Sequence, residues 1–316
     1  MPQPSPTDPS ATASTTTSAG TALATPPLGR HFEAGGRQLL LHRSGIGGPT
    51  VVFLAGSGAM SLDYLNIHDR VAELTRSVLY DRAGNGWSDP VALPRTAAEV
   101  TDELRELLRA AALPGPYVLV GHSLGGAYAR HYARRFPGEV AGLLLLDPFH
   151  ESMLSLASEQ IRAKLTELHD SQPPEPTDDQ LHRAREALGP TFANWPQEVR
   201  EPLIERHLAT WRSGLAEGRN LYVEVAEELR QAPPLPDIPL IVLTAMGVDP
   251  VQVQLWSEET AREMNEGKHR LHAQLAAEVP RGEQRVLLDA GHAWLHEERQ
   301  DAVLQAVGDL LGMVGR

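Results

Sequence analysis

The residues best suited to do chemistry stand in the stretch "YVLVGHSLGGAYARHYA", residues 117–133, which contains Ser123. Residues 121–125, GHSLG, match the pattern G-x-S-x-G, in which a tight turn joins a strand to a helix and lifts the serine hydroxyl above a sheet. Side chains beside the serine would clash in such a turn, so glycine is needed on both sides. An apolar run precedes this turn and a helical pattern follows it. We therefore predict that Ser123 is a nucleophile, the alternative being a glycine-rich turn with an incidental serine.

A serine hydroxyl needs a base to take its proton, and a histidine held by a carboxylate is the expected base. Of the 13 histidines, His292 stands out because it ends the apolar stretch "RVLLDAGH", in a Gly-His turn just before the last helix. His296 lies four residues further on and is the local rival. We predict that His292 is the base.

The carboxylate that orients the histidine has two candidates. Asp249 follows the apolar run "PLIVLTA" by a short loop, and Asp147 follows "GLLLL" directly. Both stand at the carboxyl ends of strands, where open α/β sheets place their sites. Either one gives the chain order Ser, acid, His, so this order does not decide between them. We favour Asp249 and keep Asp147 as the runner-up, whose alternative role is to form a turn.

Acyl chemistry also needs hydrogen-bond donors for a developing oxyanion. The backbone N–H of Leu124 is one expected donor. The glycine-rich loop at residues 56–58, after the apolar run "VVFLA", is expected to supply the other. The alternative for this loop is a flexible turn without a role in binding.

The elements that must position these residues alternate along the chain. Near-continuous apolar strands and amphipathic helices follow one another from about residue 50 to residue 148, which predicts a parallel sheet covered on both faces. Residues 30–44 read as a hairpin with glycines 35 and 36 at its turn. "TAAEVTDELRELLRAA" predicts a helix in which Thr96 is the N-cap and Glu99 completes a capping box.

The strand pattern stops at Phe149 and resumes at "IPLIVLTA"; the patterns between are helical. We therefore predict one α/β core, residues 29–148 and 237–316, interrupted by a helical cap over residues 149–236. Residues 1–28 are rich in Ser, Thr, Pro and Ala, and we predict a disordered tail there.

Composition argues against several classes of function. The 316 residues carry a formal net charge of −13, so nucleic acid is not an expected partner. The chain has no cysteine, which removes disulfides, thiolate metal sites and cysteine catalysis. No motif for a metal or a phosphate-bearing cofactor is complete, so we expect neither a metal nor a cofactor.

Targeting signals are also not apparent. No run approaches the ~18 apolar residues of a membrane helix, and the N-terminal residues lack the basic start and apolar segment of a secretory signal. We expect a cytoplasmic protein that acts on a small molecule and not on a membrane. The sequence does not indicate an oligomeric state.

The motifs "LAGSG", "DRAGNGWSD", "GHSLGG", "LLLLDP", "PLIVLTAMGVD" and "DAGH" together resemble the α/β-hydrolase superfamily, in its group of cap-bearing, esterase-like members. The resemblance runs from about residue 30 to the C-terminus. It implies an α/β-hydrolase fold, with a mostly parallel eight-stranded sheet, helices on both faces and a helical cap insertion. It maps Ser123, Asp249 and His292 onto the family's triad, and it maps Ser57 and Leu124 onto the oxyanion donors.

The resemblance also implies which residues surround a substrate. It places Asp81 in a structural role and puts Asn85 and Trp87 at the mouth of the site. The residues that we expect to line the substrate pocket are Gly56, His122, Asn85, Trp87 and Phe149. One departure concerns the oxyanion loop, where Ala55-Gly56 stands in place of the His-Gly of many members, whose histidine braces the loop.

The expected activity is therefore hydrolysis of an ester, thioester or lactone of a small to medium apolar substrate, through an acyl-enzyme on Ser123. A triad-dependent acyltransferase, lyase or cyclase is the alternative. An aminopeptidase or a non-catalytic ligand-binding member is a lesser one. A serine nucleophile argues against the dehalogenases and epoxide hydrolases of the superfamily, which use an aspartate.

Overall fold

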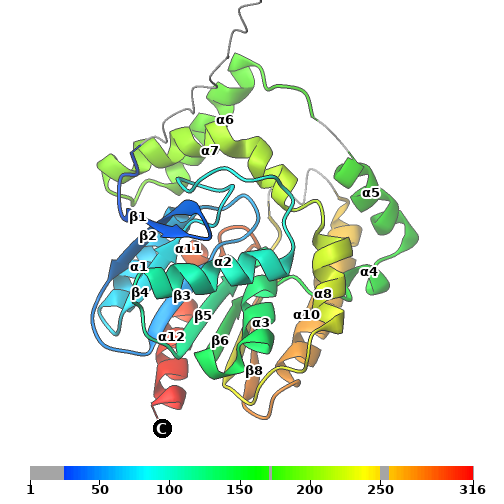
Figure 1. Cartoon of the computed structure of the whole chain (residues 1–316). Coiled ribbons are helices and arrows are strands. Elements are labelled where there is room, and N and C mark those ends of the chain that lie inside the picture. The colour runs from blue at the N-terminus through cyan, green and yellow to red at the C-terminus, as the bar shows by residue number, and fades with distance from the viewer. Residues whose placement is uncertain (1–24, 171–172, 250–255, 316) are drawn as a thin grey trace, which may run out of the picture.

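An eight-stranded sheet forms the centre of the computed structural model, which describes residues 25–170, 173–249 and 256–315 (Figure 1). The strand order is β1-β2-β4-β3-β5-β6-β7-β8. Strand β2 pairs antiparallel with both β1 and β4. All other neighbouring pairs, from β4 to β8 in the sheet order, are parallel. This confirms the expected mostly parallel sheet. The strands are β1 (Arg30–Ala34), β2 (Arg37–Ser44), β3 (Thr50–Leu54), β4 (Ser77–Tyr80), β5 (Tyr117–His122), β6 (Val140–Leu146), β7 (Leu240–Ala245) and β8 (Gly282–Leu287).

The apolar strands are buried on both sides, which explains their near-continuous hydrophobic sequences. In β6, Leu143 and Leu145 belong to the core on one face, whereas Leu144 and Leu146 belong to the core on the other. Successive side chains of a strand point to opposite faces, so both faces need apolar residues. Each fully buried leucine contributes about 1.5–3 kcal/mol relative to an exposed one.

Helices cover both faces of the sheet (Figure 1). The capping box predicted at the start of α2 is present, since the Thr96 hydroxyl accepts from the N–H of Glu99 and the Glu99 side chain accepts from the N–H of Thr96. The helices of one face are α2 (Ala97–Ala110), α3 (Leu124–Arg135) and α10 (Glu258–Ala276). Those of the other are α1 (Leu65–Ala72), α11 (Leu295–Glu298) and α12 (Gln300–Val314). Two 3-10 turns, η1 (Ser61–Tyr64) and η2 (Pro137–Glu139), complete the core.

The segment between β6 and β7, which we call the helical insertion (residues 149–236), forms helices joined by loops, with no strand among its described residues. Helices α6 and α7 lie over one edge of the sheet, and α4 and α5 lie to the side of it (Figure 1). The last helix, α8, packs on the core instead, where the Arg134 side chain donates to the backbone oxygen of Leu229 over 2.7 Å. The helices are α4 (Met153–Leu156), α5 (Glu159–Asp170), α6 (Asp178–Thr191), α7 (Gln197–Glu217), η3 (Leu221–Val225) and α8 (Ala226–Gln231).

Two further expectations concern the ends and the environment of the chain. Most of the predicted tail, residues 1–24, lies outside the described residues, whereas Leu28 packs against the core. None of the helices within the described ranges is both long enough and apolar enough to cross a membrane. The cytoplasmic location stays a prediction.

Candidate active site

Ser123 lies in the turn between β5 and α3, with φ 51° and ψ −118°. A positive φ is strained for a residue with a side chain, and such strain clusters at functional sites. A Cβ on Gly121 would lie 2.5 Å from the backbone oxygen of Gly125, and a Cβ on Gly125 would lie 2.0 Å from that of Leu54. Glycine is therefore required on both sides of Ser123, as the sequence pattern predicts.

His292 reaches Ser123 from the loop between β8 and α11. Its Nε2 lies 3.0 Å from Ser123 Oγ, at hydrogen-bond distance. The rival, His296, is buried and engaged elsewhere: its Nε2 donates to the backbone oxygen of Asp63 over 3.2 Å, and its ring stacks on Tyr64. The structure therefore brings His292, and not His296, to the serine.

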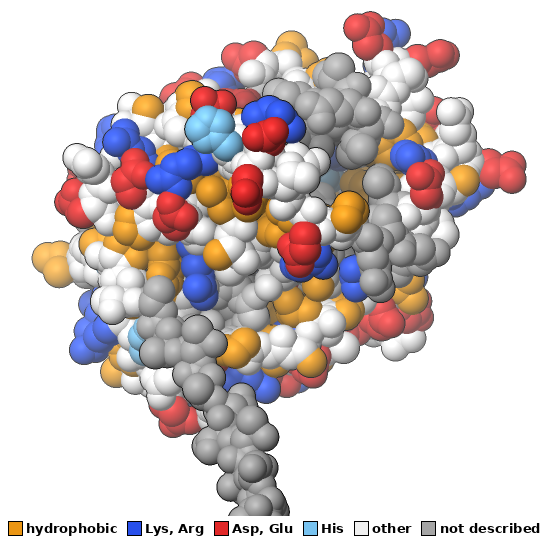
Figure 2. All heavy atoms as spheres, turned by 90° about the horizontal axis from the view of Figure 1, so that it is seen from above, with side chains coloured by type: hydrophobic (Ala, Val, Ile, Leu, Met, Phe, Trp, Pro, Cys, Tyr) orange, Lys and Arg blue, Asp and Glu red, His pale blue; other side chains and the backbone are white. Residues whose placement is uncertain are grey.

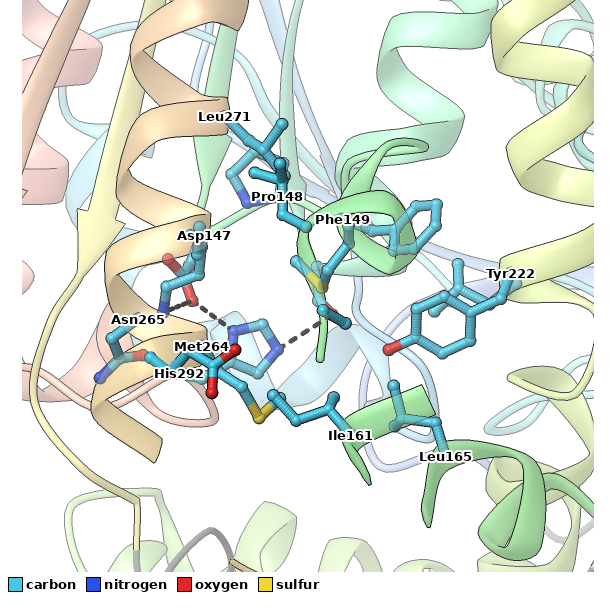
Figure 3. A pocket seen from close by; sticks show the side chains of 18 residues that line it. Asp147, Pro148, Phe149, Ile161, Leu165, Tyr222, Met264, Asn265, Leu271 and His292 are labelled. Atoms are coloured by element: carbon cyan, nitrogen blue, oxygen red, sulfur yellow. Dashed lines mark hydrogen bonds and ion pairs between the residues drawn. The ribbon is translucent and has the colours of Figure 1, made fainter. Parts of the chain in front are cut away.

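The carboxylate that contacts the His292 ring is that of Asp147. The prediction that Asp249 orients the ring was therefore wrong, and the runner-up Asp147 takes that place. His292 Nδ1 donates to Asp147 Oδ2 over 2.6 Å, and the backbone N–H of Ala245 donates to Asp147 Oδ1 over 2.9 Å. Figure 3 shows the ring of His292 facing Asp147, and the other ring nitrogen of His292 is the one that contacts Ser123. The physical reason is the sheet order, because Asp147 directly follows β6, and β6 is the neighbour of β5, the strand that leads into Ser123.

Asp249 supports the backbone of the loop that carries the base. Its Oδ2 accepts the backbone N–H of His292 over 2.7 Å and that of Ala293 over 3.3 Å. A Cβ on Gly291 would lie 2.3 Å from Asp249 Oδ1, so this carboxylate lies close against the loop. Asp249 therefore fixes the position of His292 through its main chain rather than through its ring.

Lys268 stabilises the ionised form of the Asp147 carboxylate. The Asp147 side chain is buried, and burial acts to raise the pKa of a carboxyl group. Lys268 Nζ lies 2.8 Å from Asp147 Oδ2, and Lys268 together with His292 outweighs burial and lowers the pKa of Asp147 below its ordinary value. Asp147 is therefore ionised at neutral pH. Lys268 is one of only two lysines in the chain, but no sequence motif marks it as part of the site.

The glycine-rich loop at residues 56–58 borders the same cavity as Ser123. The Ser57 hydroxyl donates to the backbone oxygen of Gly214 over 3.1 Å, so the group that Ser57 can offer a substrate is its backbone N–H. Leu124 is the first residue of α3, and the first N–H groups of a helix have no acceptor within it. The two predicted donors thus lie next to Ser123, one along the chain and one across the cavity.

A buried ion pair braces this loop. Arg82 donates to the backbone oxygens of Ala55 and Gly56 over 2.8 Å and 2.6 Å. Its guanidinium also pairs with Glu217 of α7, whose Oε2 accepts the backbone N–H of Gly58 over 3.0 Å. Burial opposes the charge of Arg82, yet Glu217 keeps the pKa of Arg82 above its ordinary value. The helical insertion therefore helps to shape the loop.

Removing the charge of Glu217 should destabilise the protein. Glu217→Gln leaves the buried guanidinium of Arg82 without its partner, and breaking one side of a buried pair typically costs about 3–5 kcal/mol. Glu227→Gln is the matched control, because the Glu227–Arg230 pair is exposed and should contribute less than about 1 kcal/mol. Urea unfolding of both variants measures the difference. Equal losses in the two variants would contradict the bracing role.

His122 links the loop to the base. Its Nδ1 accepts from the Tyr64 hydroxyl over 2.7 Å, and its Nε2 donates to the backbone oxygen of His292 over 2.8 Å. The Tyr64 oxygen accepts in turn from the N–H of Gly56 over 3.3 Å. Burial, followed by the nearby His292, lowers the pKa of His122 well below its ordinary value. His122 is therefore neutral, and it holds both loops at the end of β5.

Two cavities meet at Ser123 and His292. The apolar cavity, of about 210 Å³, lies under α4 and α5, and the loop cavity, of about 230 Å³, lies beside residues 56–58. Phe149 lines the apolar cavity, while Gly56 and His122 line the loop cavity, as expected. Side chains from the insertion and α10 give the first its apolar character (Figure 3): Phe149, Ile161, Leu165, Tyr222, Met264 and Leu271.

Asn85 and Trp87 do not stand at the mouth of the site, which corrects that expectation. The Asn85 side chain donates to the backbone oxygen of Ala59 over 2.7 Å. The backbone N–H of Trp87 donates to Asp81 over 2.9 Å, and its ring is buried. Neither residue lines the apolar cavity or the loop cavity. The loop folds back on Asp81, so both residues act in its packing.

One group of side chains in the described part of the chain could hold a cation. Potential ligand atoms of His42, His68 and Asp69 lie within 4.8 Å of one another. Zinc ligands lie about 2.0–2.3 Å from the metal, so closing such a site would need the side chains to move together. None of the three residues lines the cavities at Ser123, so these side chains take no part in chemistry at the serine.

The sequence of this chain matches a known protein family and several curated proteins. Residues 51–306 match a family described as "Alpha/beta hydrolase family". Lipase LipV of Mycobacterium tuberculosis is 34% identical over 134 residues, which are 42% of this chain and 48% of that protein. The chain spans less than half the length of the first curated relatives it matches.

Solved structures agree with this family match at the level of the fold. A thermophilic esterase from Thermogutta terrifontis superposes with a TM-score of 0.61 at 22% identity, covering 90% of this chain and 98% of that one. The meta-cleavage product hydrolase CumD from Pseudomonas fluorescens superposes with a TM-score of 0.60 at 16% identity, with the same coverage of both chains. At these identities the likeness concerns the fold alone.

Proposed function

Because this chain belongs to the alpha/beta hydrolase family, we propose that it is a hydrolase, which cleaves an ester, thioester or lactone through an acyl-enzyme on Ser123. The observation that carries the proposal is the pair of contacts made by one imidazole. His292 lies 3.0 Å from Ser123 Oγ and 2.6 Å from Asp147 Oδ2. A nucleophile, a base and an orienting carboxylate in this order form a working acyl-transfer site.

Each residue then has a defined step. Ser123 attacks the substrate carbonyl while His292 Nε2 takes the hydroxyl proton, and His292 later returns that proton to the leaving group. Asp147 fixes the Nδ1–H tautomer of the ring and stabilises the imidazolium that forms. The backbone N–H groups of Leu124 and Ser57 stabilise the oxyanion. Water, activated by His292, then releases the acid and restores Ser123.

The cavities favour a small to medium substrate with one apolar part. The apolar cavity holds that part next to Ser123, and the helical insertion serves as the cap over it. Seen from above, the described part of this face carries acidic and basic side chains among apolar ones (Figure 2). The net charge of −13 in addition repels an anionic partner such as nucleic acid. A small molecule fits this surface better than a nucleic acid does.

Two series of esters test the proposal. One varies the acyl chain of p-nitrophenyl esters from two to sixteen carbons, and the other varies the alcohol of acetate esters over the same range. One of the two variable parts, the acyl chain or the alcohol, should enter the apolar cavity. In that series we expect kcat/KM to be highest for chains of short to medium length. Lack of turnover in both series by the folded protein would contradict an esterase function.

Filling the apolar cavity should shift this optimum. Ile161 of α5 lines the cavity and is buried, so Ile161→Trp adds bulk where the substrate should lie. Because one methylene in an apolar pocket changes kcat/KM by about ten-fold or more, we expect at least a ten-fold loss for the best ester and a shift to shorter ones. Leu215→Trp places the same bulk on an exposed position outside the cavity and should leave the optimum in place. An unchanged optimum in Ile161→Trp would place the substrate elsewhere.

A further inference from the structure

Lys268 makes a contact that the three-residue mechanism does not require. Its Nζ lies 2.8 Å from Asp147 Oδ2, the same oxygen that accepts from His292 Nδ1 over 2.6 Å. The second oxygen, Oδ1, is taken by the backbone N–H of Ala245 over 2.9 Å. When His292 is protonated, Asp147 Oδ2 therefore accepts hydrogen bonds from two cations, the Lys268 ammonium and the imidazolium. The lysine comes from α10, a core helix that packs on β7 and β8, and its side chain is only 9% exposed.

The other titratable groups around Asp147 do not supply a second fixed positive charge. His272, also on α10, lies 3.9 Å from Asp147 Oδ1, and burial lowers its pKa to about 4 despite the carboxylate. His122, at the end of β5, is neutral for the reason given above. Asp249 faces the backbone of His292 and adds negative charge to the same loop. Among the described groups around the Asp147 carboxylate, the lasting positive charge is therefore that of Lys268.

An ammonium at this place has two consequences for the base. It compensates a carboxylate that would otherwise be buried at high cost, and so it keeps Asp147 ionised and aimed at the ring. It also lies on the same carboxylate oxygen as His292 Nδ1, where its positive charge offsets part of the negative charge that faces the ring. We propose that Lys268 is a positioning residue that sets the lower pH limit of the reaction, by holding Asp147 and reducing its pull on the His292 proton. This inference rests on the serine hydrolase function proposed above.

Charge and hydrogen bonding at Lys268 can be separated by two substitutions. Lys268→Gln keeps a neutral donor near Asp147 but removes the charge, whereas Lys268→Arg keeps the charge. The measurement is kcat/KM for an aryl ester from pH 4.5 to pH 9, with thermal unfolding to confirm that each variant is folded. We expect the acidic limb of the profile to move up by about one pH unit in Lys268→Gln, with a loss of about ten-fold below it. Lys268→Arg should keep the limb of the unmodified protein.

A purely structural lysine would give a different result. In that case the acidic limb would stay in place in Lys268→Gln. Activity would fall by the same factor at every pH, or only stability would fall. Either outcome with an unmoved limb overturns the inference. If Lys268→Gln does not fold, Lys268→Met removes the same charge with an apolar stem suited to a buried site, and it is judged by the same criterion.

A second readout separates this inference from the proposed function. The His292 ring is titrated by NMR in the Ser123→Ala chain, with and without Lys268→Gln. An upward shift of its midpoint in the absence of the lysine supports the inference even if no ester is hydrolysed, and an unchanged midpoint contradicts it. Absence of turnover in the unmodified protein, by contrast, counts against the proposed function alone.

Discussion

Replacing Ser123 with alanine should lower kcat for an aryl ester by about 10⁴- to 10⁶-fold, because in the proposed mechanism the acyl-enzyme forms on the Ser123 hydroxyl. The fold should be unaffected, since the hydroxyl has a described hydrogen bond to His292 alone. Alanine keeps the same Cβ in the strained turn, so the backbone strain at φ 51° is unchanged. Initial rates at saturating ester and a thermal melt measure the two effects.

A serine outside the site provides the control for this substitution. Ser155 is exposed and its hydroxyl donates to the backbone oxygen of Ser152, so Ser155→Ala should retain the activity of the unmodified protein. If Ser123→Ala kept turnover within ten-fold of this control, Ser123 would not be the nucleophile. If Ser123→Ala lost both turnover and its cooperative thermal unfolding transition, Ser123 would have a structural role, which would also contradict the prediction.

The second large effect should appear at the carboxylate that contacts the His292 ring. Asp147→Asn should lower kcat by about 10³- to 10⁴-fold, since an amide at this position favours the wrong imidazole tautomer and no longer stabilises the imidazolium. It should also destabilise the fold by about 3 kcal/mol, because Lys268 loses its buried partner. Activity is therefore measured well below the melting temperature of the variant, and the unfolding free energy is measured separately.

Asp249→Asn is the matched comparison for this prediction. The amide oxygen of the substituted side chain can still accept the backbone N–H of His292, so the loop should remain in place and kcat should fall by about ten-fold or less. A larger loss in Asp249→Asn than in Asp147→Asn would reverse the assignment and restore our original preference for Asp249 as the acid.

The nucleophile and the base could be predicted from the sequence because each depends on local patterns. Ser123 sits in a turn whose neighbouring glycines are required by backbone clashes, and His292 ends an apolar strand. The sheet was predictable for the same reason, since strands buried on both faces need continuous apolar runs. These features depend on nearest neighbours in the chain, which a single sequence records.

The acid and the loop at residues 82–87 could not be predicted in the same way. Both aspartates follow strands, and only the path of residues 246–249 directs Asp249 to the backbone of the His292 loop. The Arg82–Glu217 pair joins positions 135 residues apart, across the boundary between core and insertion. Periodicity carries no information on contacts of this kind. The scarcity of lysine was the one available signal for Lys268, and it gave no hint of its partner.

The central claim is that the Ser123 hydroxyl is made reactive by His292. The most direct measurement treats the folded protein with a fluorophosphonate probe and locates the adduct by peptide mass spectrometry. We expect one adduct, on the peptide that contains Ser123, and its formation should slow by at least about 10³-fold in His292→Ala. An adduct on another residue, or a folded protein that stays unlabelled, would contradict the account, as would labelling of Ser123 at the same rate without His292.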